Sequence, residues 1–286
     1  MQKSEISYRP LRNLILSEVI PWLVSTKVIV MGLFLLATGF LTVKNYTQGL
    51  QSAHSDMNFF ESIAWFLMTG MGSISLCSLA FLAMIAEMPK RTAYCSYTLI
   101  RTSKAKWAAS LIMQCFFTVA FTMLALLIVI SVFLIPFVSA GNVWNDSLRI
   151  EAGMPEELAY IPNWIRASMT PIQAILLSAI PVFCFWFVMS LTILICSLLH
   201  IPAVGLALYS VILFSGLIFV FENFPGIVTP MTFSTLMRIT ANHQSNEYER
   251  LIVVFIGYAI LIVCQITSVF LIVKRTDTTS TMISEG

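Results

Sequence analysis

The chain has 286 residues, of which 58% are hydrophobic and only 10% are charged, against roughly 25% charged residues in soluble domains. Its mean hydropathy of +0.87 means that apolar side chains outnumber those that a globular core of this length could shield from water. The composition excludes a soluble fold and predicts an all-α, polytopic membrane protein with one transmembrane domain over residues 1–286. The small net charge of +2 and the scattered basic residues argue against a nucleic-acid partner.

Six apolar stretches approach the length of about 20 residues that a helix needs to cross a bilayer. A polar segment precedes the first stretch, so we expect that stretch to be a retained span and not a cleaved signal peptide. The third and fourth are long enough to tilt or extend beyond the membrane, and Pro181 predicts a bend in the fourth. Residues 200–203 alone separate the fourth from the fifth, which predicts an antiparallel hairpin. The predicted spans are residues 25–43, 63–86, 107–138, 172–199, 204–221 and 251–273.

The distribution of Lys and Arg predicts the orientation, because basic residues beside spans are retained on the cytoplasmic side. One set of segments holds Lys3, Arg9, Arg12, Lys90, Arg91, Arg101, Lys104, Lys106, Lys274 and Arg275. The opposite set holds Lys44, Arg149, Arg166, Arg238 and Arg250. We therefore expect both termini in the cytoplasm. In the second outward loop, Trp144, Tyr160 and Trp164 are typical of side chains that anchor at a membrane surface.

The interior of the predicted spans contains no Asp, Glu, Arg or His, which secondary transporters and pumps use as ion relays. The sequence also lacks paired intramembrane aspartates, an HExxH zinc motif and a P-loop, so it predicts neither a membrane enzyme nor a chain that binds ATP itself. No metal or other cofactor is expected in this chain. The six cysteines fall almost wholly in apolar runs, where they are expected to pack as small apolar residues.

The connection between the second and third spans carries the most informative pattern. Glu87 and Pro89 suit the first turn of a helix, and from Ala93 apolar residues recur at i, i+4 and i+7, which gives a short apolar face. This pattern predicts a cytoplasmic helix over residues 88–102 that docks onto another protein. The alternative is an ordinary basic loop that obeys the positive-inside rule. The predicted partner-binding residues are Glu87, Arg91, Tyr94, Tyr97, Ile100 and Arg101.

In this connection the chain resembles the permease subunits of type-2 ATP-binding-cassette (ABC) exporters. Those permeases have an acid at the end of the second span, a Gly-Thr-like element, a Leu-containing helix, and a Ser/basic segment before the third span. The matching residues are Glu87, Arg91-Thr92, Leu99-Ile100-Arg101-Thr102-Ser103 and Lys104 to Lys106. Arg91 stands where the family usually has Gly, so the bend there is expected to differ. The motif covers residues 87–106, whereas the six-span pattern covers the whole chain.

The resemblance implies that residues 88–102 form a coupling helix seated on a separate ABC ATPase subunit, which binds ATP and Mg²⁺. It also implies an interfacial helix over residues 8–20 along the inner leaflet. The apolar, Pro-punctuated stretch 224–233 is the candidate for the family's re-entrant element in the outer leaflet. The chain is then expected to be a multi-pass protein of the cell (inner) membrane that is a transport subunit and not an enzyme. It would pair with a second permease, as a homodimer or a heterodimer.

Small and polar residues of the second and fifth spans are candidates to line a substrate path. Close helix packing is an alternative of equal weight, since small residues promote it in membranes. Peptide, lipid-linked glycan and drug substrates all stay open. The alternative function is a non-transporting membrane scaffold, receptor or immunity protein that holds partners without an ATPase. The candidate path residues are Thr69, Ser73, Ser75, Ser210 and Ser215, with Gly70, Gly72, Ser78 and Gly216 beside them.

Overall fold

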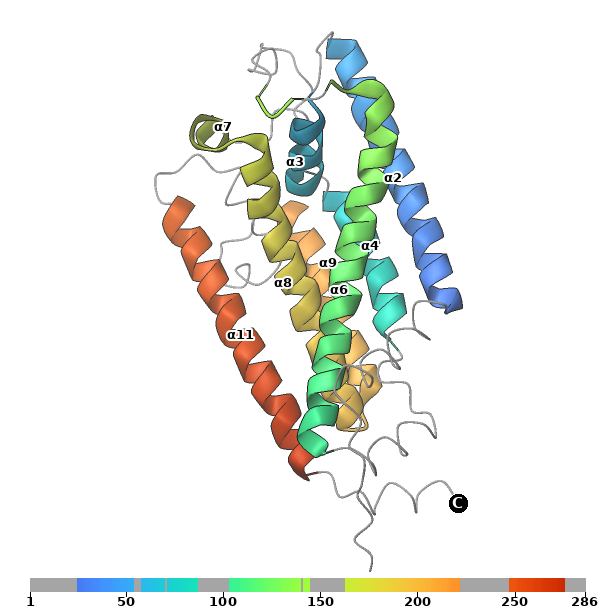
Figure 1. Ribbon diagram of the computed structural model, residues 1–286, viewed down its shortest axis with the longest axis vertical. Helices are drawn as coiled ribbons and strands as arrows, with labels where there is room; N and C mark the ends of the chain where they lie inside the picture. The colour runs from blue at the N-terminus through green and yellow to red at the C-terminus, as the bar shows by residue number, and fades with distance from the viewer. Residues whose placement is uncertain are drawn as a thin grey trace, which may run out of the picture.

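The described part of the chain is almost wholly α-helical, and it contains no strand; Asn58 and Ser139 form one isolated bridge. The long helices lie side by side and alternate in direction along the long axis of the molecule (Figure 1). The predicted all-α fold is therefore confirmed. The computed structural model describes residues 25–53, 58–69, 71–86, 103–139, 141–144, 163–221 and 247–275.

The helices follow the apolar runs of the sequence. Three described segments are both long and apolar enough to cross a membrane, and they coincide with the third, fourth and sixth predicted spans: Lys104–Phe137, Pro171–Leu198 and Phe255–Arg275. Shorter apolar helical stretches, Thr26–Leu41 and Pro202–Phe214, fall in the first and fifth. The helices are α2 (Thr26–Ala53), α3 (Phe59–Thr69), α4 (Met71–Ile85), α6 (Lys104–Leu134), η1 (Ile135–Phe137), α7 (Asn163–Ser168), α8 (Pro171–Leu198), α9 (Pro202–Phe221) and α11 (Glu247–Arg275).

The second predicted span, residues 63–86, comprises two helices where the sequence suggested one run. α3 ends at Thr69 and α4 begins at Met71. Gly70 and Gly72 lie at this point of the sequence, and a glycine inside a helix costs about 1 kcal/mol relative to alanine. α3 packs on α6 and α8, whereas α4 packs mainly on α2 and α9. The two halves of this span therefore have different neighbours.

α8 is the central helix of the bundle. It packs against α3, α6, α9 and α11, and 67% of its apolar stretch is buried, compared with 17% for α11. Pro171 occupies its first turn, where the missing proline N–H costs nothing, and Gln173 Oε1 accepts from the Thr170 N–H at 2.8 Å. The helix continues past Pro181 as far as Leu198, and the bend at Pro181 stays a prediction.

α8 and α9 form the predicted antiparallel hairpin. His200 has a φ of 65°, in the left-handed region that commonly ends helices, and the Ile201 N–H donates to the Cys196 carbonyl at 2.9 Å. A Cβ added at Gly205 would lie 3.0 Å from Cys196 Cβ and 3.1 Å from Ile193 Cα. The short link and this glycine allow the two helices to touch near the turn.

The bundle has two chemically different ends. At one end α2 and α6 begin and α8 and α11 end (Figure 1); we call it the basic end, because it carries Lys104, Lys106, Lys274 and Arg275. At the opposite end, called the α7 end, α3, α8 and α11 begin beside α7. The predicted interfacial helix (8–20), coupling helix (88–102) and re-entrant element (224–233) lie outside the described residues.

Candidate functional site

The predicted partner-binding segment lies outside the described residues, but its flanks are present. α4 ends at Ile85. α6 begins at Lys104 with Ser103 as its N-cap, whose Oγ accepts from the Lys106 N–H at 3.4 Å. Both flanks are directed toward the basic end (Figure 1). The residues between these flanks that were predicted to bind an ATPase are Glu87, Arg91, Tyr94, Tyr97, Ile100 and Arg101.

The predicted path residues lie on three helices. Thr69 is the last residue of α3, Ser73 and Ser75 belong to α4, and Ser210 and Ser215 belong to α9. α4 and α9 pack against each other, so the structure brings these two helices together. The Ser210 side chain is half-buried. The adjacency fits both a shared path and close helix packing.

Ser78 shows the packing alternative in atomic detail. It is fully buried, and its Oγ accepts a hydrogen bond from Trp186 Nε1 of α8 at 2.8 Å. The Tyr209 hydroxyl of α9 donates to the Ser78 carbonyl at 2.8 Å. Phe81 stacks on Trp186 with ring centroids 5.3 Å apart. Ser78 is therefore part of a junction between α4, α8 and α9, which is the contact expected from close helix packing.

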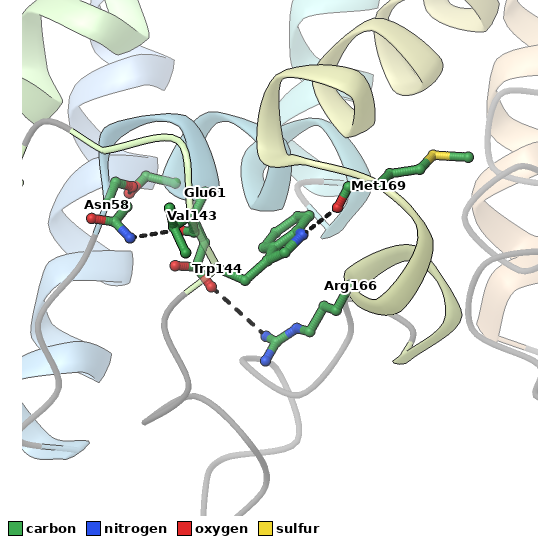
Figure 2. A network of polar contacts seen from close by, with 7 residues as sticks. Asn58, Glu61, Val143, Trp144, Arg166 and Met169 are labelled. Carbon is green, nitrogen blue, oxygen red and sulfur yellow. Dashed lines mark hydrogen bonds and ion pairs between the residues drawn. The ribbon is translucent and has the colours of Figure 1, made fainter.

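A buried ion pair lies at the α7 end (Figure 2). Glu61, in the first turn of α3, is fully buried, and its Oε1 lies 4.0 Å from Nη2 of Arg166 in α7. A carboxylate in the first turn also faces the positive end of the helix dipole. Two unit charges 4 Å apart attract by about 4 kcal/mol at an effective dielectric constant of about 20. The guanidinium therefore offsets much of the cost of burying the Glu61 carboxylate.

Trp144 lies beside this ion pair (Figure 2). The Arg166 Cζ lies 5.9 Å from the centroid of the Trp144 ring, within the range of a cation–π interaction. The indole Nε1 donates to the Met169 carbonyl at 2.6 Å. The ring packs against a small apolar cluster formed by Ala64, Ile165 and Ala174. Trp144 thus contacts Arg166, Met169 and the small cluster, and its predicted place at the membrane surface stays a prediction.

Asn58 joins the segment after η1 to the start of α3. Its Nδ2 donates to the Val143 carbonyl, and its Oδ1 accepts from Ser139 Oγ at 3.2 Å. The Phe59 N–H donates to the Ser139 carbonyl at 3.0 Å. A Cβ added at Gly141 would lie 2.7 Å from Asn58 Oδ1, so a larger residue at this position would require the Asn58 side chain to shift. The contacts of Asn58, Glu61, Trp144 and Arg166 form one network, which we call the α7-end network.

Sequence reasoning missed the α7-end network. It counted Arg166 among the outward basic residues and did not pair it with Glu61. The available signal was a single acid inside the first turn of an otherwise apolar helix. Buried acids are rarely found without a partner, but the sequence alone does not show which of several outward basic residues that partner is.

A further polar contact lies within the apolar part of the bundle. Gln265 Nε2 of α11 donates to Thr192 Oγ1 of α8 at 2.8 Å, and Thr192 Oγ1 donates to the Val188 carbonyl at 2.9 Å. Hydrogen bonds between membrane helices contribute about 0.6–2 kcal/mol each. This bond holds α11, the least buried of the three long apolar helices, against the central helix.

The chemistry of these contacts is structural. Within the described ranges, no group of three His, Cys, Asp or Glu side chains could hold a metal ion. The α7-end network provides one matched pair of charges, which fastens α7 to α3. No family model matches the chain, and comparisons with curated proteins and with solved structures return no match. The function is therefore inferred from the residues and their arrangement.

Proposed function

We propose that this chain is the membrane-spanning permease subunit of an ATP-driven exporter. It would work as a dimer with a second permease and be coupled to separate ABC ATPase subunits. The observation that carries the proposal is the connection between α4 and α6. Over residues 87–106, an acid, a basic-Thr element, a Leu-containing stretch and a Ser/basic segment follow one another in the order found in type-2 exporter permeases.

The arrangement of the helices supports this proposal. Because they alternate in direction (Figure 1), they fit six crossings in which α3 and α4 together make the second. Under the positive-inside rule, the basic end faces the cytoplasm. In this orientation both termini lie on the cytoplasmic side. Residues 88–102 then lie on the same side, where an ATPase is available.

The absence of ionisable side chains from the apolar helices supports an external energy source. No Asp, Glu, Lys, Arg or His occurs in residues 107–137, 171–198, 202–221 or 255–273. Secondary transporters build their relays from such residues. The energy for transport would therefore come from ATP hydrolysis on a partner subunit.

The proposal is tested at the predicted coupling helix with Tyr97→Ala combined with Ile100→Ala. Each interface anchor of this kind contributes ~2 kcal/mol or more to binding, so the double variant should insert normally and lose its ATPase on purification in mild detergent. Substrate-stimulated ATP hydrolysis should disappear with it. Arg101→Ala is the control, because a charge at the rim of an interface mainly changes the salt dependence of binding.

Two results would contradict the proposal. One is full retention of the ATPase by the double variant, which would make residues 88–102 an ordinary basic loop. The other is a wild-type protein that never purifies with an ATPase. Either result would favour a non-transporting scaffold, receptor or immunity protein.

A further inference from the structure

The basic end brings the start of α6 against the end of α11 (Figure 1). Lys104 Nζ, in the first turn of α6, donates to the carbonyl of Lys274, in the last turn of α11, at 3.3 Å. Trp107 and Val273, which neighbour these two residues along the chain, are both buried in the main core. The two helix termini are therefore held together by packing as well as by the hydrogen bond.

This contact concentrates positive charge. Lys104 belongs to one helix, and Lys274 and Arg275 belong to the other. Cations are favourable at the C-terminus of α11, but at the N-terminus of α6 a lysine adds to the positive end of the helix dipole. The acids in the described part of the chain all lie at the starts of α3 and α11, toward the α7 end: Glu61, Glu247 and Glu249.

Trp107 adds a buried donor to the same place. Only 7% of the residue is exposed, and its indole Nε1 is buried without a hydrogen-bond partner among the described residues. Trp107 follows Lys104 by three residues, so the two side chains lie on the same face of α6. A buried donor left without an acceptor is costly. An acceptor that reaches this face would satisfy the Trp107 indole beside Lys104, next to the end of α11 that carries Lys274 and Arg275.

We propose that Lys104, Trp107, Lys274 and Arg275, called the α6–α11 junction, bind the phosphate of an anionic phospholipid. The junction lies at the ends of two helices of membrane-crossing length, so it would lie near the lipid headgroups if both helices cross the bilayer. Lys and Arg reach lipid phosphates from this depth by extending their side chains along the helix. A phosphate would accept from the indole N–H and the ammonium groups, and it would lie at the favourable N-terminus of α6. This proposal does not depend on the chain being an exporter subunit.

The test measures lipid retention by the full-length protein with native mass spectrometry. The detergent-purified chain is offered dioleoylphosphatidylglycerol or dioleoylphosphatidylcholine, and the wild type should retain the anionic lipid in preference. Lys104→Gln combined with Lys274→Gln should weaken phosphatidylglycerol binding about 100-fold, since each direct hydrogen bond between a lysine and the charged phosphate contributes about tenfold or more. Trp107→Phe keeps the ring but removes the N–H, and it should weaken binding about threefold to tenfold.

Lys106→Gln is the matched control. It removes the same charge from the same turn of α6, but Lys106 is about 200° around the helix from Lys104, so it should change binding less than twofold. Equal losses at Lys104 and Lys106 would show diffuse attraction and overturn the site, as would unchanged binding in the double variant. Displacement of the lipid by millimolar inorganic phosphate would show that a free anion is the ligand.

If the double variant does not fold, Trp107→Phe decides the question alone, because it preserves the packing. Unchanged lipid binding by Trp107→Phe would then overturn the proposal.

Discussion

Removing one partner of the Glu61–Arg166 pair is expected to cost more stability than removing both. The Glu61 side chain is 1% exposed and that of Arg166 is 13% exposed, so neither charge can be fully hydrated if the other is lost. Removing one member of such a pair costs about 3–5 kcal/mol. Arg166→Gln should lie at the upper end of this range, because it strands the more deeply buried charge. Glu61→Gln should lie at the lower end, because the guanidinium keeps some water and the Trp144 ring.

The double variant, Glu61→Gln with Arg166→Gln, leaves two neutral side chains and no buried charge. It should cost only about 1 kcal/mol, the net worth of an ordinary hydrogen bond. Because each single loss is about 3 kcal/mol or more and the double loss about 1 kcal/mol, the double-mutant cycle should give a favourable coupling energy of about 5 kcal/mol or more. The free energy of unfolding can be followed by titration with sodium dodecyl sulfate in mixed micelles, with circular dichroism as the signal.

Lys44→Gln provides the control for this cycle, since it removes an exposed charge from α2 and should change stability by no more than about 0.5 kcal/mol. Additive single-variant effects, with a coupling energy below about 0.5 kcal/mol, would refute the interaction. A double variant as unstable as Arg166→Gln would do so too, since the loss would then come from packing and not from charge.

Two more predictions concern helix packing and sidedness. Gly205→Ala should destabilise the α8–α9 hairpin by about 1–3 kcal/mol, because the new Cβ meets the Ile193 backbone at 3.1 Å. Gly257→Ala is the control: a Cβ there meets nothing within 4 Å, so the variant should stabilise α11 by about 1 kcal/mol. Equal changes in the free energy of unfolding for the two variants would contradict the close contact at Gly205. With the exposed Cys264 replaced by Ser, a cysteine introduced at Ser147 or Gln244 should react with an impermeant thiol reagent on intact cells and one at Ser103 should not. The reverse labelling pattern would place the basic end outside the cell and remove the basis of the coupling-helix assignment.

The hydropathy of the sequence was sufficient to locate the long helices. In a bilayer every backbone polar group must be satisfied within the segment, so an apolar run of sufficient length has to be helical. The spans predicted at 107–138 and 172–199 correspond to Lys104–Phe137 and Pro171–Leu198. The break between α3 and α4 could not be located in this way, because the run 63–86 stays apolar throughout it. The glycines beside the break were the available signal, and they also suited a substrate path.

Contacts between distant side chains could not be predicted from a pattern of this kind. Ser139 and Val143 both reach Asn58, and the direction of that approach depends on how η1 ends and on the space left at Gly141. Likewise, the partner of Trp186 became apparent only when α4 and α8 were placed side by side. Periodicity identifies the face of a helix that is buried, but it does not identify the helix that covers that face.

The packing of α9 limits where the proposed polar path would run in this chain. Tyr209 is buried and bonded to α4, whereas Val204, Leu208 and Val211 are exposed on the same helix. The exposed face of α9 is therefore apolar over these turns and suits lipid or a second subunit better than water. Ser210 follows Tyr209 by about 100° around the helix and is half-buried, so it lies between the two faces. Because the neighbouring Ser78 is already used for packing, the proposed path would have to run along this flank if it includes Ser210, and a second permease of the proposed dimer would then complete it.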